Sequence, residues 1–267
     1  MSDDKSIRVT VTAVKQWAPT LFSFRVTRPD GFKFTAGQFV RLGMATQDLA
    51  YFENTAAQAN DEKIFRAYSV VSSPYDEFIE FFSVVIPDGA FTAKLQYLQV
   101  GDSLWLNTTP FGFLTLARYQ LPLPKDLWLL ATGTGLAPFL SILKTLEVWE
   151  QYQRIHLIYS ARTTQELAYT DEIAEIKALY GEDGADFVFV PIVTRDATYT
   201  GLTKRLPELI LSGELEQQVG CQLDITTSHV MLCGNPQMVE DTKDALKQRG
   251  LTMNRRGEGN IAVENYW

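Results

Sequence analysis

A glycine turn between an apolar run and a helical run is the clearest candidate for a phosphate-binding site. Gly133-Thr134-Gly135 follows the apolar residues 127–132 and precedes residues 137–149, which have helical spacing. A glycine turn lets the backbone approach a phosphate, and the start of the following helix offers free N–H groups. An ordinary strand-to-helix turn is the alternative, but the order of strand, glycine turn and helix favours a nucleotide site.

Three arginines lie at or near the ends of the strands expected after this turn. Arg162 follows the apolar residues 155–160, Arg195 follows residues 187–193, and Arg205 comes ten residues later. Ligands of parallel sheets bind outside the carboxyl ends of the strands, and arginine forks bind phosphate well. A solvated surface arginine is the alternative for each one singly. Together they indicate an extra phosphate, which is the group that distinguishes NADP from NAD.

In the first half of the sequence, a cation, a flat ring and a hydroxyl lie within four residues. These are Arg66, Tyr68 and Ser69. On a strand, Arg66 and Tyr68 share one face, and Ser69 points to the other unless the strand bends. Gly89 and Thr92 then begin a helical run, where a phosphate could also bind. The set suits a flavin nucleotide, and a plain strand with a core tyrosine is the alternative.

The elements that must position these groups differ between the two halves of the chain. In the first half, short runs with strand character are separated by Gly, Pro and Asp turns. These runs are residues 7–17, 20–29, 38–44, 66–73, 77–87 and 102–110. With one helical piece at 92–98 and a long polar loop at 44–64, they predict a small antiparallel six-stranded β-barrel.

From about residue 120, strand runs alternate with helical runs. The strand runs are residues 127–132, 155–160, 187–193 and 229–234, and the helical runs are residues 137–149, 170–180, 203–212 and 236–250. This alternation predicts βαβ units around a parallel sheet. Residues 121–128 carry two prolines and have the character of a linker. We therefore expect a barrel domain over residues 1–120 and a parallel-sheet α/β nucleotide-binding domain over residues 121–267.

Composition limits the kinds of partner that the protein can have. The chain has 267 residues, of which 46% are hydrophobic and 21% are charged. These values are typical of a folded protein and leave room for two domains. The net charge of −8 and the pI near 4.9 disfavour nucleic-acid binding, because phosphate contacts need a basic surface.

Cysteines and histidines are too few for several kinds of site. The two cysteines cannot ligate a four-cysteine iron–sulfur cluster or build a disulfide scaffold. His156 and His229 begin apolar strand runs without spaced metal-binding neighbours, so no metal site is expected. No apolar run reaches the roughly 20 residues of a membrane span, and the first residues lack signal-peptide features. The sequence therefore predicts a cytoplasmic protein with no membrane segment.

These motifs, in this order, resemble the ferredoxin–NADP+ reductase family. The resemblance rests on the Arg-x-Tyr-Ser run at 66–69, the Gly-x-x-Thr run at 89–92, "TGTGLAP" at 132–138, "CGNPQM" at 233–238 and the terminal "VENYW". It spans about residues 8–267 and is nearest to the bacterial, FAD-containing members that end on an aromatic pair. The loop at 44–64 departs from the more compact barrels of those members.

For FAD, the resemblance implies roles for residues in the barrel domain. Arg66 would neutralise the pyrophosphate, Tyr68 would stack on the flavin ring, and Ser69 would hydrogen-bond near flavin N5. Ala67 lies within the same FAD-binding run. The other FAD-binding residues implied are Phe82 on the adenosine side, Ala90, Phe91 and Thr92 at the phosphates, and Thr134 near both cofactors.

The last two residues are also implied in FAD binding. Tyr266 would cover the flavin face, and Trp267 would stack on the FAD adenine. Stacking of this kind typically adds about 0.5–1.5 kcal/mol beyond burial. The alternative is that both rings dock in a barrel groove without a cofactor contact. The C-terminal residues of the second domain would thus return to the flavin.

For NADP, the resemblance implies that Gly133, Gly135, Gly234 and Asn235 contact the nucleotide. Arg162, Arg195 and Arg205 match positions that clamp the 2′-phosphate. Cys233 and Glu264 match residues close to the nicotinamide, although a thiol at 233 could equally be a buried strand residue without a role. The catalytic set implied is Ser69, Cys233, Glu264 and Tyr266, with no metal.

The activity implied is hydride exchange between NADP(H) and FAD, followed by one-electron transfer to or from ferredoxin or flavodoxin. The protein is expected to act as a monomer. A flavin reductase or oxygenase-type reductase that uses NAD(P)H is an alternative within the same superfamily. A non-catalytic flavin-binding module that senses redox state is an alternative from a different class. A preference for NADH would contradict the roles of the three arginines.

Overall fold

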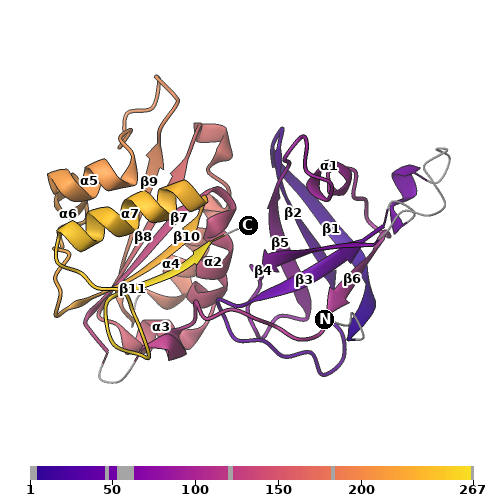
Figure 1. Cartoon of the computed structure of the whole chain (residues 1–267), viewed down its shortest axis with the longest axis horizontal. Coiled ribbons are helices and arrows are strands. Elements are labelled where there is room, and N and C mark those ends of the chain that lie inside the picture. The colour runs from indigo at the N-terminus through magenta and orange to yellow at the C-terminus, as the bar shows by residue number, and fades with distance from the viewer. Residues whose placement is uncertain (1–4, 46–47, 53–62, 120–122, 182–183, 266–267) are drawn as a thin grey trace. The chain divides into compact units, whose positions relative to one another are not determined.

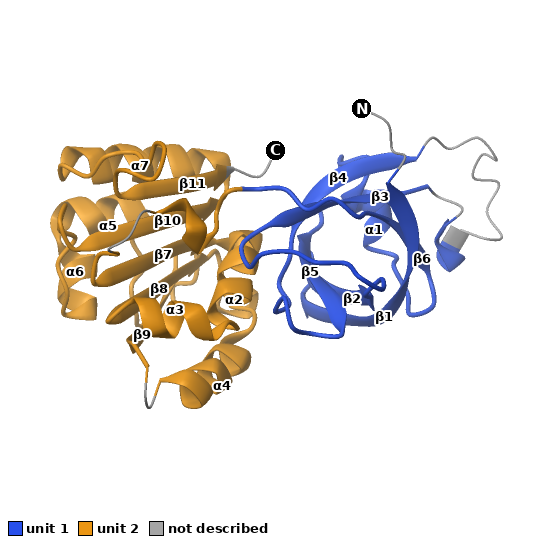
Figure 2. Cartoon of the chain, turned by 90° about the horizontal axis from the view of Figure 1, so that it is seen from below, with its two compact units in different colours: residues 1–112 blue, residues 113–267 orange. Residues whose placement is uncertain are grey.

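The computed structural model describes residues 5–45, 48–52, 63–119, 123–181 and 184–265 and shows two units, Met1–Gly112 and Phe113–Trp267. Figure 2 shows these units in different colours. The first unit is built of strands with one short α-helix, whereas strands and helices alternate in the second. The fold class predicted from the sequence, an antiparallel barrel followed by a parallel α/β sheet, is therefore confirmed.

The division between the units comes before residue 113, whereas the proline linker predicts it after residue 120. The segment between these points is held by side chains of its own. The Arg118 guanidinium donates to Asn254 Oδ1 (3.1 Å) and to the Asn254 carbonyl (3.2 Å). The Tyr119 hydroxyl lies 3.2 Å from the Val230 carbonyl and 3.1 Å from that of Asn260. Because these partners all belong to the second unit, the segment folds with it.

Six antiparallel strands form the first unit. They are β1 (Ser6–Ala18), β2 (Leu21–Thr27), β3 (Phe39–Met44), β4 (Ile64–Ser69), β5 (Phe78–Val84) and β6 (Ser103–Asn107). Their order is β4-β3-β6-β1-β2-β5, and Figure 2 shows the sheet curling on itself. A bridge between Val70 and Phe81 links the two outermost strands of this order. Alternate side chains such as Val9, Phe24 and Leu104 point inward and form the core.

The long loop predicted at residues 44–64 connects β3 with β4. Its beginning is anchored to the barrel. The Asp48 carboxylate accepts a hydrogen bond from the Ala45 N–H (2.8 Å) and pairs with Arg8 (3.2 Å), and Leu49 is part of the barrel core. This part of the loop therefore contributes to barrel packing.

Five parallel strands form the sheet of the second unit (Figure 1). They are β7 (Asp126–Thr132), β8 (Arg154–Ala161), β9 (Asp186–Val193), β10 (Ser228–Gly234) and β11 (Ile261–Asn265), in the order β11-β10-β7-β8-β9. The chain proceeds from β7 through β8 to β9 and then crosses to the other side of β7 for β10 and β11. The order thus reverses between β7 and β10. Open α/β sheets bind ligands at such a reversal, outside the carboxyl ends of the strands.

The helices of the second unit are α2 (Ala137–Leu143), α3 (Leu146–Gln151), α4 (Thr170–Tyr180), α5 (Leu206–Ser212), α6 (Glu214–Val219) and α7 (Pro236–Gln248). The helix predicted at 137–149 is two helices, because Thr145 is extended and its hydroxyl bonds the Ile142 carbonyl (2.7 Å). The sequence does not predict α6, which buries only Leu215, or β11, whose apolar run is short. None of the described helices has the length and apolar character needed to cross a bilayer.

His229 is buried in the second unit between two tyrosines. The Tyr152 hydroxyl lies 2.8 Å from Nδ1 of His229, and the Tyr119 ring stacks on the imidazole with centroids 3.6 Å apart. Burial lowers the pKa of His229 to about 4. The ring is therefore neutral at pH 7, while the unfolded chain would bind a proton near pH 6.5.

We predict that His229 makes stability depend on pH. Its contribution is fully present above about pH 6.5 and is lost as the pH falls toward 4, because only the unfolded chain then binds the proton. Between pH 7.5 and pH 5, the His229→Gln variant should lose less unfolding free energy than the parent, by about 1–2 kcal/mol. Urea denaturation at both pH values measures this difference. The same pH dependence in both proteins would contradict a neutral, buried His229.

Candidate functional site

The carboxyl ends of β7, β10 and β11 lie side by side in the second unit. Cys233 of β10 pairs with Ala131 of β7 on one side and with Glu264 of β11 on the other. β7 continues into a 3-10 helix at Gly133–Leu136, from which α2 follows directly. The structure therefore brings the glycine turn together with Cys233 and Glu264, residues that the sequence resemblance assigns to the nicotinamide.

Close packing explains the glycines of the turn. A Cβ atom at Gly135 would lie 2.2 Å from the Cys233 carbonyl oxygen and 2.6 Å from the Gly234 Cα atom. Gly133 has a φ of +53°, in the left-handed region, with open space around it. One glycine thus permits a close approach of two backbones, and the other permits the turn itself.

These two glycines give a matched pair of variants. Gly135→Ala should destabilise the protein by about 3 kcal/mol, because the new methyl group meets the backbone of β10. Gly133→Ala should destabilise it by only about 1 kcal/mol, because the residue has space and suffers only from its positive φ. Chemical denaturation of both variants measures the difference. Equal losses would show that the contact with Cys233 does not constrain the turn.

Asn235 begins α7 and links that helix to β7. Its side-chain oxygen accepts hydrogen bonds from the N–H groups of Gln237 (3.0 Å) and Met238 (3.2 Å), as expected of an N-cap. Its own N–H donates to Thr132 Oγ1 (3.1 Å). Gly234 before it has a φ of +140°, and a Cβ there would lie 2.3 Å from the same Thr132 oxygen. Thr132 therefore holds the end of β7, before Gly133, against the end of β10 at Gly234. It was not predicted from the sequence as a site residue.

Cys233 and Glu264 differ in exposure. Cys233 is completely buried, as its position within β10 requires, and Glu264 is half-buried near the end of β11. Thr134 in the turn is also half-buried, and Gly135 behind it is buried. Of these residues, Glu264 and Thr134 are therefore the ones whose side chains remain in contact with solvent.

All three arginines are exposed, and Arg162 and Arg195 follow strand ends as predicted. Arg162 comes directly after β8, and its carbonyl accepts a hydrogen bond of 2.7 Å from the N–H of Arg195, which lies two residues beyond β9. Arg205 is the residue just before α5. The Thr164 hydroxyl donates to Asp196 (2.7 Å), which ties the same two loops a second time. The structure thus places the backbones of Arg162 and Arg195 side by side.

Two carboxylates lie among these arginines. The Arg162 guanidinium donates to both Glu166 oxygens, the shortest distance being 2.5 Å. Burial acts to raise the pKa of Glu166, but the hydrogen bonds from Arg162 outweigh it and leave the pKa below its usual value. Hydrogen bonds from Thr198 and Thr164 lower the pKa of Asp196 to about 2. Both carboxylates are therefore charged at neutral pH, and Glu166 would compete with a phosphate for Arg162.

The sequence analysis missed Glu166. It stands four residues after Arg162, and this spacing is a known signal for an ion pair in a helix. Here the pair forms across a short 3-10 helix, Thr164–Glu166, and is reinforced by a hydrogen bond from the Arg162 N–H to Glu166 (3.1 Å). The spacing alone could have indicated this partner.

In the first unit, the predicted FAD-binding run lies on β4. Arg66 pairs with Leu42 and Tyr68 with Val40, so both lie on one face of the sheet, as the sequence predicts. Tyr68 is buried, and its hydroxyl lies 3.1 Å from the Ser83 hydroxyl. Burial raises the pKa of Tyr68 to about 12. Only the 8% of Tyr68 that remains exposed is available to a ligand.

Arg66 stays exposed because β4 is the outermost strand of the sheet order. Its guanidinium donates to the neighbouring Phe65 carbonyl (2.8 Å). Ala67 is exposed as well, whereas Ser69 at the end of β4 is buried. Phe82 is buried on β5, on the face opposite the core residue Phe81.

The second predicted phosphate site of the first unit lies at the start of helix α1 (Thr92–Leu95). Ala90 is exposed, while Phe91 is buried and packs against Tyr68 with ring centroids 5.8 Å apart. The Thr92 hydroxyl accepts from the Ile86 N–H (3.0 Å) and lies 3.3 Å from the Ile86 carbonyl, closing the loop before the helix. The helix predicted at 92–98 thus keeps only its first turn. Tyr266 and Trp267 lie outside the described residues.

Comparisons with known proteins agree with this arrangement. Residues 129–244 match the family model described as "Oxidoreductase NAD-binding domain". The flavodoxin/ferredoxin–NADP reductase of Buchnera aphidicola subsp. Baizongia pistaciae is 36% identical, and the alignment covers 98% of each chain. The flavodoxin/ferredoxin–NADP reductase of Escherichia coli K12 is 38% identical over 96% of this chain and 97% of its own.

A solved structure is similar over the same extent. It is the crystal structure of a ferredoxin NADP+ reductase from Neisseria gonorrhoeae with bound FAD and NADP, which shares 37% sequence identity. The TM-score is 0.84, and the match covers 98% of both chains. On the sequence identity and this coverage, the chain belongs to the ferredoxin–NADP reductase family.

Proposed function

We propose that the protein exchanges a hydride between NADP(H) and FAD, and passes single electrons to or from ferredoxin or flavodoxin. The observation that supports this most directly is the likeness to the Neisseria gonorrhoeae reductase, which holds FAD and NADP. Bound FAD would supply the chemistry, since a flavin takes up two electrons together and releases them one at a time. The residues of this chain would bind, orient and shield the two nucleotides.

The first unit would hold FAD. Arg66 is an exposed cation without an ion pair among the described residues, which suits a pyrophosphate. Tyr68 would offer its exposed remainder to the flavin ring, and Ser69 would hydrogen-bond near N5. The rest of the proposed FAD set is Ala67, Phe82, Ala90, Phe91, Thr92, Thr134, Tyr266 and Trp267. Of these, the Thr92 hydroxyl would have to release the Ile86 carbonyl before it could donate to a phosphate.

The second unit would hold NADP(H). The glycine turn lies at the reversal of strand order, where a dinucleotide is expected. Gly133, Gly135, Gly234 and Asn235 would let the backbone approach the nucleotide, and the exposed Arg162, Arg195 and Arg205 would clamp its 2′-phosphate. Cys233 and Glu264 would lie by the nicotinamide, where their task is orientation and electrostatics.

The choice of partner follows from the same proposal. The structure offers no four-cysteine set for an iron–sulfur cluster, because the sequence has only two cysteines, both described and buried. The one-electron partner is therefore a separate protein. We also propose a cytoplasmic location. We further propose that the protein works as a monomer.

Anaerobic stopped-flow spectroscopy of the purified protein tests the proposal. We expect a yellow protein whose extract contains FAD, rapid bleaching by NADPH, and electron transfer to ferredoxin or flavodoxin. Reduction of free flavin but not of either protein would favour the flavin reductase or oxygenase-type alternative. Bound FAD without NADPH turnover would favour the redox-sensing module. A colourless protein that stays colourless when offered FAD would refute all three.

A further inference from the structure

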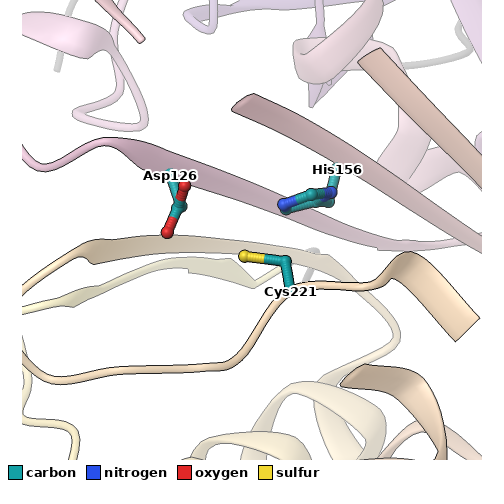
Figure 3. Close-up of side chains that lie close together, drawn as sticks. All are labelled: Asp126, His156 and Cys221. Atoms are coloured by element: carbon teal, nitrogen blue, oxygen red, sulfur yellow. The ribbon is translucent and has the colours of Figure 1, made fainter. Parts of the chain in front are cut away.

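Three side chains with metal-binding atoms meet in the second unit, at the end of the sheet opposite the glycine turn. Asp126 is the first residue of β7, His156 the third of β8, and Cys221 follows α6 (Figure 3). Their ligand atoms all lie within 4.8 Å of one another. All three are buried, with exposed fractions of 0%, 1% and 7%.

His156 lacks a hydrogen-bond partner. Neither Nδ1 nor Nε2 of its ring is bonded among the described residues, although the ring is almost completely buried. Its neighbour on one side is the Trp128 ring, with centroids 4.4 Å apart. Buried polar groups are nearly always satisfied, so an orphaned imidazole that faces a carboxylate and a thiol requires an explanation. A metal ion bound to one ring nitrogen would provide it.

The donor set fits one class of metal. An imidazole nitrogen, a thiolate sulfur and a carboxylate oxygen together favour Zn2+ over Mg2+ or Ca2+, which prefer oxygen alone. If all three atoms stood 4.8 Å apart, a central ion would lie about 2.8 Å from each. Zinc bonds of about 2.0–2.3 Å would then need inward shifts of less than 1 Å. Rotamer adjustments can supply movements of this size.

The surroundings support the ligands. Arg154 holds the Asp126 carboxylate through two hydrogen bonds, of 2.5 Å and 3.0 Å. These bonds fix the carboxylate, as partners of metal ligands commonly do. His156 and Cys221 also line a cavity of about 820 Å³, which would admit the ion and a water molecule.

We propose that Asp126, His156 and Cys221 bind one Zn2+ ion, with water from the cavity as the fourth ligand. On binding, the Cys221 thiol releases its proton to solvent. β7 has seven residues, so the site lies about 20 Å from the glycine turn at the strand's other end. The ion would therefore stabilise the second unit and take no part in hydride transfer. The expectation of no metal site, drawn from the sequence, is revised accordingly.

An internal hydrogen bond is the competing use of these groups. The Cys221 thiol can donate to the Asp126 carboxylate without any metal. That arrangement leaves both ring nitrogens of His156 without a hydrogen-bond partner, which a bound metal ion would explain.

Titration of the chelator-treated, full-length protein with Zn2+ and with Co2+ tests the proposal. We expect one ion per chain and, with Co2+, thiolate charge-transfer and ligand-field bands, the latter at longer wavelengths than flavin absorption. Cys221→Ser and His156→Leu should each weaken binding at least about 100-fold. Zn2+ at a hundredfold excess over the parent's Kd should raise the thermal midpoint of the parent by about 5–10 °C and that of each variant by no more than about 2 °C.

The sequence supplies matched controls, since it contains only two cysteines and two histidines. Cys233→Ser and His229→Gln should keep the cobalt spectrum and the zinc affinity. Circular dichroism checks that each variant is folded. If a ligand variant does not fold, the cobalt spectra of the parent and of the two control variants still test the proposal. NADPH-dependent activity should not change with zinc, so failure here is separate from failure of the proposed function. No stoichiometric binding, or binding unchanged in both ligand variants, would overturn the proposal.

Discussion

Replacing Arg162 with alanine should raise the KM for NADPH about 10- to 100-fold, while the KM for NADH changes by less than about twofold. The two coenzymes differ only in the 2′-phosphate, which we propose is bound by Arg162, an exposed residue just after β8. A lost charge-assisted hydrogen bond typically costs about 1.5–3 kcal/mol, which gives this range. Steady-state kinetics with both coenzymes measure the effect.

Glu166→Gln should act in the opposite direction. In the structure, this carboxylate accepts hydrogen bonds from Nε and Nη2 of Arg162, so a phosphate would compete with it for these donors. A neutral amide would compete less well, and we expect the KM for NADPH to fall by about two- to fivefold at low salt. Higher ionic strength should reduce the gain.

A surface lysine provides the control for both variants. Lys247 on α7 pairs with Asp244 at 3.3 Å, and removing it deletes one positive charge from the same unit. Lys247→Ala should leave the preference for NADPH over NADH unchanged. If Arg162→Ala also kept that preference, the arginine would have no part in coenzyme choice.

Replacing Arg66 with alanine should weaken FAD binding about 10- to 100-fold without unfolding the barrel. The side chain is exposed, and its hydrogen bond to the Phe65 carbonyl joins adjacent residues, so the loss of stability is small. The expected result is a folded but largely colourless preparation. FAD titration followed by flavin fluorescence gives the dissociation constant, and circular dichroism reports the fold.

Arg41 is the matched control for Arg66. It lies on the adjacent strand β3, opposite Ala67, and its guanidinium stands 5.4 Å from the Phe65 ring. Arg41→Ala removes the same charge from the other face of the sheet and should leave FAD affinity unchanged. Similar losses in both variants would indicate a general electrostatic effect and would contradict a specific contact from Arg66.

Local patterns in the sequence predicted the glycine turn and the strands with clear apolar runs. Gly133 and Gly135 lie between a strand and a helix, and the close contact of Gly135 with β10 explains why a glycine is needed there. Arg162 and Arg195 follow strands whose apolar runs are unambiguous. Strand β11 escaped prediction because its few apolar residues become a strand only by pairing with β10.

Contacts between distant residues could not be predicted in this way. Asp126, His156 and Cys221 are far apart in the sequence and lack any metal-binding spacing; the pairing of β7 with β8 and the packing of the segment after α6 bring them together. The start of the second unit at Phe113 could not be predicted for the same reason. The hydrogen-bond partners of Arg118 and Tyr119 lie more than a hundred residues away in the sequence. The predicted roles of Tyr266 and Trp267 fall outside the described residues.

The paired backbone of Arg162 and Arg195 bears on any attempt to redesign coenzyme preference. The N–H of Arg195 donates to the Arg162 carbonyl, and Thr164 is tied to Asp196, so each loop is part of the other's support. Transplanting one loop from an NADH-using enzyme would remove one side chain of the Thr164–Asp196 pair, and the backbone bond would persist only if the new loop follows the same path. A successful exchange would have to graft the two segments together, as a single cassette.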